Sequence, residues 1–171
     1  MDQEKFLSQK EISLHKVLLV LFFSSYIYSV DSVLTANELI SKNLYFTQNT
    51  NIGLEEVSSK GKIIRGINNI EITIDYPSKE KYLIQDSTIE IYDYEFNQSQ
   101  IFEINDDNSF IIDFFNNGID FNDVKNIEDN SFMVTKNKND FFVKIISDSR
   151  FLISYKDNMD YKNSIIFEVI K

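Results

Sequence analysis

Alternation of apolar and polar residues is the feature of this sequence that most constrains its fold. The segment IEIYDYEFNQSQIFEI, residues 89–104, alternates, breaks for a few turn-prone residues and then alternates again. A period of two places one face of each strand against an apolar interior and the other in water. The segment therefore predicts a β-hairpin, and it raises the question of what the apolar face covers.

Similar alternation runs through most of the chain beyond residue 43. In NIEITIDY, residues 69–76, it places Ile70, Ile72 and Ile74 on one face, and Pro77 ends the strand. Turn signals recur every 8–12 residues or so, which is typical of an all-β barrel or sandwich. We expect about nine to eleven antiparallel strands. The other predicted strands lie in residues 43–50, 60–66, 81–86, 88–93, 100–104, 131–136, 140–146, 150–155 and 164–170, with a turn-rich stretch between the first two.

A short helix is predicted before the strands, in VLTANELISKN, residues 33–43. Thr35 and Glu38 have the spacing of a capping box, in which each side chain satisfies a backbone N–H group at the helix start. Leu39 and Ile40 supply an apolar stripe. We therefore expect the helix to begin near Thr35.

A second helix is predicted in SFIIDFFNNG, residues 109–118, where apolar residues recur at helical spacing. Ser109 is a plausible N-cap and Gly118 a plausible terminator. Phe114 and Phe115 lie on this helix. They fit a lid over the sheet and ordinary core packing equally well.

Residues 1–32 have the pattern of a secretory signal peptide. Lys16 precedes a mostly apolar run at residues 17–28, too short for a bilayer span of about 20 residues. Small residues suited to cleavage follow at Ser29 and Ser32. The domain expected after processing covers residues 33–171. An uncleaved anchor or a buried helix is the alternative.

Composition excludes several classes of function. The formal charge of −10 and the pI of about 4.5 argue against nucleic acid as a partner, since phosphate binding needs a basic face. Cysteine is absent, and the one histidine, His15, lies in the predicted signal peptide. A processed chain would lack imidazole and thiol chemistry, so we expect no enzyme, metal site or cofactor. The acidic pairs at 55–56 and 106–107 are interpreted as solvated turn residues.

Five short phrases occur in an order known from one family. They are FTQ at 46–48, SSKGKII at 58–64, IEITIDYP at 70–77, YLIQD at 82–86, and IEIYD at 89–93 with Gln98 six residues after Tyr92. In this order and spacing, residues 39–115 resemble the LolA-like family of outer-membrane lipoprotein carriers. The resemblance lies in the order of the phrases more than in any one of them.

The sequence also departs from the family pattern. The usual Arg-Pro is Arg65-Gly66 here, one residue short, and Ile72 occupies the place of a tryptophan. The usual Asp-Gly turn is Asp86-Ser87. Beyond Phe115 only the strand pattern agrees, so the resemblance implies the fold of that half and no residue roles within it.

The resemblance implies a mainly β fold, in which a curved antiparallel sheet forms an incomplete β-barrel and short helices cover its concave face. It implies a monomeric periplasmic carrier of acylated lipoproteins. Its implied partners are an inner-membrane ABC lipoprotein-releasing complex and an outer-membrane lipoprotein receptor. Each buried methylene contributes about 0.8 kcal/mol, so long acyl chains need a shield to cross water. A lipid-binding or envelope-sensing module of the same superfamily is the alternative.

The implied site is an apolar cavity with a lid. The resemblance assigns Arg65 to the lid, where the family's arginine holds the closed helices through their carbonyl groups; an exposed arginine at a strand end is the alternative. The isoleucines of the cavity also fit the core of a closed sheet. The predicted cavity residues are Ile70, Ile72, Ile74, Ile89, Ile91, Phe114 and Phe115.

Overall fold

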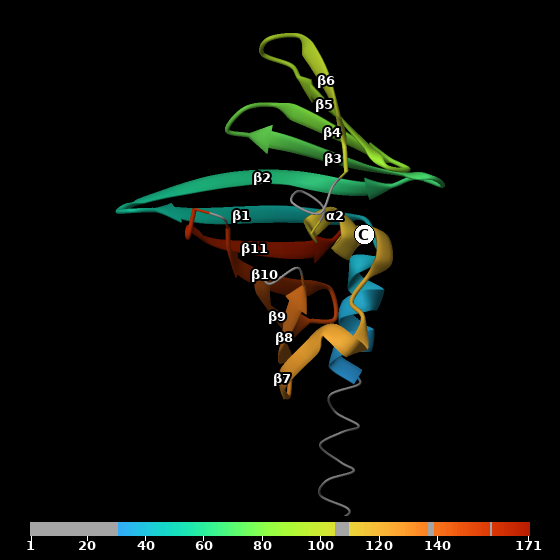
Figure 1. Cartoon of the computed structure of the whole chain (residues 1–171), viewed down its shortest axis with the longest axis vertical. Coiled ribbons are helices and arrows are strands. Elements are labelled where there is room, and N and C mark those ends of the chain that lie inside the picture. The colour runs from blue at the N-terminus through green and yellow to red at the C-terminus, as the bar shows by residue number, and fades with distance from the viewer. Residues whose placement is uncertain (1–30, 105–109, 137–138, 158) are drawn as a thin grey trace, which may run out of the picture.

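Eleven antiparallel strands form one sheet in the computed structural model, which describes residues 31–104, 110–136, 139–157 and 159–171. The sheet order is β6-β5-β4-β3-β2-β1-β11-β10-β9-β8-β7 (Figure 1). The strands are β1 (Leu44–Ile52), β2 (Glu55–Arg65), β3 (Asn69–Tyr76), β4 (Glu80–Gln85), β5 (Thr88–Asp93), β6 (Gln98–Glu103), β7 (Val124–Glu128), β8 (Ser131–Lys136), β9 (Asn139–Ser147), β10 (Arg150–Lys156) and β11 (Lys162–Val169). The predicted mainly β class and strand number are confirmed.

The sheet is open. Strands β6 and β7 lie at its two ends, and each pairs with one neighbour only among the described strands. Two meanders, β1 to β6 and β7 to β11, meet where β1 pairs with β11. The result is the incomplete barrel expected for this chain.

Three helical segments accompany the sheet. The structure describes residues 31–40 of a helix, called the N-terminal helix below, together with α2 (Phe110–Asn117) and the 3₁₀ turn η1 (Phe121–Asp123). The prediction that the first helix begins at Thr35 is wrong, because Thr35 lies inside a helix that already includes residue 31. The predicted second helix is present, and Gly118 follows it with a φ of +71°. Its predicted N-cap, Ser109, lies outside the described residues.

The hairpin predicted from residues 89–104 is present as β5 and β6. Asp93 forms its turn, since its Oδ1 atom accepts hydrogen bonds from the backbone N–H groups of Glu95 and Phe96. The predicted burial of one face holds for β5 only. All six residues of β6 are exposed, because β6 is the edge of the sheet.

Two other regions differ from the sequence prediction. The stretch expected to be rich in turns is mostly strand, since β1 extends to Ile52 and β2 already begins at Glu55. Strand β7 and the turn η1 were not predicted. Strand β7 is short, and its register with β8 shifts between Lys125 and Glu128, so its alternation is weak.

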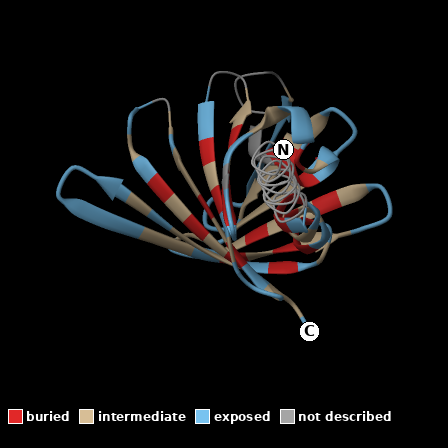
Figure 2. Cartoon of the chain, turned by 90° about the horizontal axis from the view of Figure 1, so that it is seen from below, coloured by how far each residue is buried: buried red, intermediate tan, exposed pale blue. Residues whose placement is uncertain are grey.

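The core lies between the concave face of the sheet and the helices. Figure 2 shows buried residues on the strands that surround the helices and exposed residues toward the strand ends. One cluster joins Leu39 of the N-terminal helix, Phe115 of α2 and Phe167 of β11. Residues 1–30, the greater part of the predicted signal peptide, lie outside the described residues. Within the described chain, no helix has the length and apolar character needed to span a bilayer.

Candidate functional site

The concave face of the first half of the sheet carries isoleucines that align across neighbouring strands. Ile70 on β3 lies opposite Ile84 on β4, and Ile84 lies opposite Ile89 on β5. All three are buried. Directly opposite residues of an antiparallel pair share a face, so this row is a continuous apolar stripe across three strands.

A second row runs beside the first and is less covered. Ile63 on β2 lies opposite Ile72, and Tyr82 on β4 lies between Ile72 and Ile91. Ile63 is buried, whereas the other three are partly buried against the core. Burial raises the pKa of the Tyr82 phenol, whose hydroxyl donates to Glu80 at 2.5 Å. The apolar face therefore reaches toward solvent between β3 and β5.

The two helices cover the central part of this face with apolar side chains. The ring of Phe115 packs edge-on against Phe167 of β11, with 5.5 Å between centroids, and Phe114 packs edge-on against Phe115 at 5.9 Å. Such edge-to-face pairs contribute beyond simple area burial. The buried apolar residues of the two helices are Val33, Ala36, Leu39, Ile40, Ile112, Phe114 and Phe115.

Arg65, at the end of β2, binds both helices through their carbonyl oxygens. Its Nε and Nη2 atoms donate to the carbonyl oxygen of Ile40 at 3.0 and 2.6 Å. Nη2 also donates to the carbonyl oxygen of Phe115 at 2.7 Å. The backbone N–H of Arg65 donates to the side chain of Asn43 at 2.8 Å. One guanidinium therefore joins the sheet to the last turns of two helices that are distant in sequence.

The electrostatics of this contact favour a guanidinium. Carbonyl groups at a helix C-terminus carry partial negative charge and attract cations. The Arg65 guanidinium also lies 5.9 Å from the centroid of the Phe115 ring. Its partial burial lowers its pKa, but arginine remains charged in proteins. Among the described residues Arg65 has no ion pair, so helix carbonyls balance its charge.

A second polar contact joins the N-terminal helix to the segment after α2. The Asn37 side chain donates to the carbonyl oxygen of Ile119 at 3.0 Å and accepts from the N–H of Ile119 at 2.7 Å. Gly118 precedes this contact, and a Cβ atom there would lie 2.7 Å from the Asn37 Oδ1 atom. The Asn37 amide thus bonds both the C=O and the N–H of Ile119, as a residue of a paired β-strand does.

Two further contacts attach the helices to the second half of the sheet. Lys136 on β8 forms an ion pair with Asp113 on α2. Ser32 on the N-terminal helix donates to the carbonyl oxygen of Asp129 at 2.9 Å. The strands are held by hydrogen-bond ladders, whereas individual side-chain contacts attach the described helices to the sheet.

Six of the seven residues predicted to line a lipid cavity belong to one apolar cluster. Ile74 is the exception: it lies opposite Gly61 and Glu80 on the same face of β3 and is half-buried. In the described conformation the helices pack on these residues, so lipid binding there stays a prediction. The buried members are Ile70, Ile89, Phe114 and Phe115, and the partly buried members are Ile72 and Ile91.

Sequence reasoning missed several residues that shape this site. Tyr82 lies in the predicted strand 81–86, but its place between two isoleucines depends on strand register. Asn37 carries no signal, because its partner Ile119 is 82 positions away. Phe46 was noted only as part of a phrase, and its packing with Phe167, at 6.4 Å between ring centroids, depends on the β1–β11 pairing.

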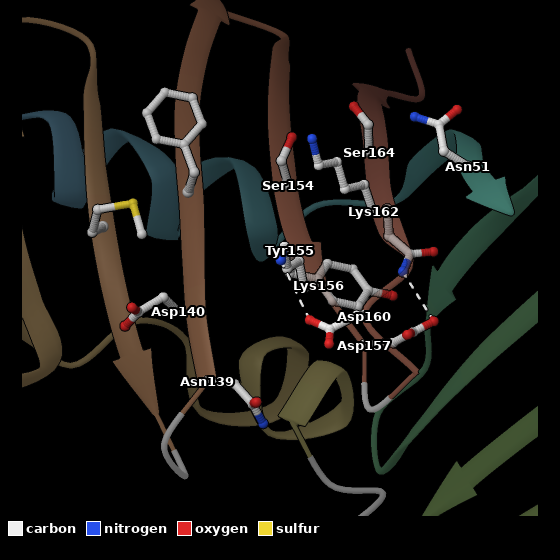
Figure 3. Close-up of a pocket in the computed structure, with 13 residues that line it drawn as sticks. Asn51, Asn139, Asp140, Ser154, Tyr155, Lys156, Asp157, Asp160, Lys162 and Ser164 are labelled. Carbon is white, nitrogen blue, oxygen red and sulfur yellow. Dashed lines mark hydrogen bonds and ion pairs between the residues drawn. The ribbon is translucent and has the colours of Figure 1, made fainter. Parts of the chain in front are cut away.

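A pocket of about 640 Å³ lies elsewhere, at the end of the sheet where β10 turns into β11 (Figure 3). Lys156 and Asp160 form an ion pair at 3.3 Å on its rim. Asn163 is buried and bonded on both sides of its amide, for example to Thr50 at 2.7 Å and Asp157 at 3.3 Å. Among the described residues no group of three acidic or histidine side chains is placed to hold a metal. The pocket is separate from the apolar site, since none of the predicted cavity residues lines it.

A smaller pocket of about 220 Å³ lies beside Arg65. Ile70 and Ile84 line one part of it, and Asn116 of α2 lines another. This pocket therefore lies at the end of the apolar stripe, next to the arginine that holds the helices.

Comparisons with known proteins find similarity in structure. No protein-family model matches the sequence, and a search of curated proteins finds no match. The chain is similar to a LolA superfamily protein from Nitrosomonas europaea, with a TM-score of 0.45 and 10% identity over 84% of this chain and 94% of that chain. It is also similar to a DUF1329 family protein from Desulfovibrio piger, with a TM-score of 0.35 and 11% identity over 85% and 90% of the two chains.

Both similarities concern the fold alone. The LolA-like architecture implied by the sequence resemblance is observed in the chain itself, as an open antiparallel sheet with two helices packed on its concave face.

Proposed function

We propose that this protein is a periplasmic carrier that shields the acyl chains of lipoproteins on their way from the inner membrane to an outer-membrane acceptor. The observation that carries the proposal is the cover of the concave face. Two helices lie on an apolar surface, and Arg65 joins both of them to the sheet. A cover attached by individual side-chain contacts is suited to a surface that is exposed in turn to different partners.

The proposed mechanism is an exchange of apolar contacts. In the closed state Phe114 and Phe115 fill the space over the sheet, together with Ile70 and Ile89. Moving the helices breaks the Arg65 hydrogen bonds and frees this face for acyl chains. The contacts that replace the phenylalanine rings are apolar and non-directional, so chains of different length are accepted and released.

The proposed partners follow from this exchange. An inner-membrane ABC complex supplies the lipoprotein, and an outer-membrane receptor accepts it through contact between the two open barrel mouths. In this scheme no nucleotide supplies energy for the transfer across the periplasm. Affinity for the acyl chains must therefore rise from donor to acceptor.

A release assay tests the proposal. The protein, purified as the exporting cell processes it, is incubated with spheroplasts that carry a labelled lipoprotein. We expect a soluble one-to-one complex of carrier and lipoprotein. Ile72→Glu, which places a carboxylate on the apolar face, should prevent release. Its matched control is Ile146→Glu, at an exposed position of β9, which should leave release intact. Retention of all lipoprotein in the membrane fraction refutes the proposal.

A further inference from the structure

Strand β6 pairs only with β5 among the described strands, and it carries exposed apolar side chains. Strand β6 ends the sheet order and lies at the top of Figure 1, at the opposite end from β7. Ile101 is 70% exposed and Phe102 43% exposed, on opposite faces of the strand. In the preceding turn Phe96 is 70% exposed. Exposed apolar residues gathered at one edge indicate a contact surface.

The backbone of this edge is available for pairing with another strand. The N–H of Ile104 donates to the carbonyl oxygen of Ser87, toward β5. Backbone groups alternate along an antiparallel strand, so the N–H and C=O groups of Ser99, Ile101 and Glu103 point away from the sheet. Natural edge strands are commonly protected by lysine, proline or a bulge, and β6 contains no lysine or proline.

The net negative charge of the chain belongs to one stretch of sequence, which includes this edge. The stretch from Tyr82 to Val124 contains ten of the 27 acidic residues and no lysine or arginine. The other 17 acidic residues equal the 17 basic ones, so the formal charge of −10 belongs to this stretch. Part of this charge lies away from β6, since Asp113 on α2 pairs with Lys136 on β8. Asp120 and Asp123 also lie away from it, at the N-cap and the end of η1, which contacts β8.

Four carboxylates of this stretch lie on the β5–β6 hairpin itself: Glu90, Asp93, Glu95 and Glu103. Glu90 is the neighbour of Ile101 across the two strands, and Glu103 follows Ile101 on the same face. Two lysines near the hairpin are already engaged. Lys79 lies over the ring of Tyr94 at 4.9 Å, and Lys81 pairs with Glu71 at 2.7 Å.

We propose that β6 is a docking edge for an extended, basic segment of a partner protein, which adds a twelfth strand to the sheet. The segment would place an apolar side chain opposite Ile101 and a lysine or arginine opposite Glu103. A second copy of this chain is disfavoured as the occupant, because pairing β6 with itself brings two acidic hairpins together. The inference concerns the lateral edge and does not depend on what the concave face carries.

Two synthetic peptides test this edge. One repeats Val-Thr-Lys-Thr, so that valine and lysine share the face that meets Ile101 and Glu103, and the other has glutamate in place of each lysine. Backbone amide NMR shifts locate the binding, and fluorescence anisotropy measures affinity at low and high salt. We expect the lysine peptide to bind about tenfold more tightly than the glutamate peptide, because Glu103 attracts a lysine across the strand pair and repels a glutamate there. Its binding should shift β5 and β6 amides and weaken with salt.

Variants at one position separate the backbone and charge contributions. Ile101→Pro removes an outward N–H while keeping the ladder to β5, and should abolish binding. Ile101→Lys keeps every backbone donor but repels the lysine peptide, so it should weaken binding of that peptide. It replaces Ile101→Pro as the test if the proline variant is too unstable to use. Ile146→Lys on β9 makes the same change at another exposed isoleucine and is expected to bind normally.

Three results overturn the inference. They are equal or absent binding of the two peptides, amide shifts confined to other strands, and normal lysine-peptide binding by Ile101→Lys. Sedimentation that shows a dimer of this chain, lost in Ile101→Lys, would assign the edge to a second copy instead.

Discussion

Phe46 on β1 lies directly across from Gly61 on β2, and its ring occupies the space that a side chain at position 61 would fill. A Cβ atom there would lie 2.7 Å from Phe46 Cζ and would overlap the carbonyl oxygen of Thr73 on β3. The β2–β3 register shifts between Lys60 and Gly61. The glycine thus permits both the bulge and the close approach of an aromatic ring where the sheet bends.

Gly61→Ala should lower the free energy of unfolding by about 1–3 kcal/mol, the usual cost of overpacking a well-filled site. Urea denaturation measures the loss. In the double variant Phe46→Leu/Gly61→Ala the smaller side chain relieves one clash, but the Thr73 carbonyl remains. We expect partial rescue, and full rescue would show that Thr73 is not an obstacle.

Gly118→Ala should destabilise the protein more than Gly53→Ala. Both glycines have positive φ values, +71° and +65°, so both substitutions carry a backbone cost of about 1 kcal/mol. Only at Gly118 would the new methyl group meet Asn37, whose two hydrogen bonds to Ile119 would be disturbed. Thermal melting of the two variants isolates the Asn37 contribution. Equal losses would contradict it.

Arg65→Leu should leave lipoprotein loading intact and slow unloading. The substitution removes three hydrogen bonds to helix carbonyls, so the closed, empty state loses stability relative to the open, loaded state. We also expect a loss of about 1–3 kcal/mol in the free energy of unfolding of the empty protein. Stopped-flow transfer from loaded carrier to acceptor measures the unloading rate.

Arg65→Lys is the matched control for that experiment. Lysine keeps the charge but lacks the planar fork that reaches two carbonyls at once, so its unloading rate should lie between those of the parent and Arg65→Leu. Unchanged transfer kinetics in both variants would remove Arg65 from lid control.

Ile72→Glu should abolish acyl-chain binding while the protein remains folded, because Ile72 lies on the partly covered end of the apolar face. An unpaired carboxylate there repels hydrocarbon but still reaches water. Titration with a fluorescent lipid, beside a thermal melt, measures both effects. Ile63→Glu, at a fully buried neighbour on β2, is expected to unfold the chain. A folded Ile72→Glu variant with normal lipid binding would exclude this position from the site.

Stability should fall in alkali. Burial raises the pKa of Tyr82 and Tyr155 above the usual value of about 10 for a tyrosine. Above that pH the unfolded chain releases these protons while the folded chain retains them, so unfolding is favoured as pH rises. In Tyr82→Phe the melting temperature should fall less steeply between about pH 9 and 11 than in the parent. Tyr45→Phe, at an exposed position, serves as the control. Identical pH profiles for Tyr82→Phe and the parent would contradict the expectation.

Much of the sheet could be predicted because alternation is a local property. Ile70, Ile72 and Ile74 lie on one face in the sequence and in the structure, and Pro77 follows the end of β3 in both. Strand β6 alternates equally well, yet both of its faces are exposed. Alternation reports which residues share a face, whereas burial depends on whether another element covers that face.

The site was less predictable, because its contacts join residues distant in sequence. The carbonyl oxygens that Arg65 binds belong to Ile40 and Phe115, which are 25 and 50 positions away. Family resemblance indicated such a contact, but no local pattern could have named those carbonyls. The helix start was misplaced because Thr35 and Glu38 have the spacing of a cap while lying inside a longer helix.

The pairing of β1 with β11 places the first and last of the described strands at the centre of the sheet, in register from Leu44 with Val169 to Asn51 with Lys162. A polypeptide that leaves a ribosome or an export channel from its N-terminus presents β1 with one bare edge until β11 has emerged. The two meanders can form early, but they join only when synthesis or translocation has delivered residue 169. Truncation of the final strand would therefore divide the molecule into two separate sheets.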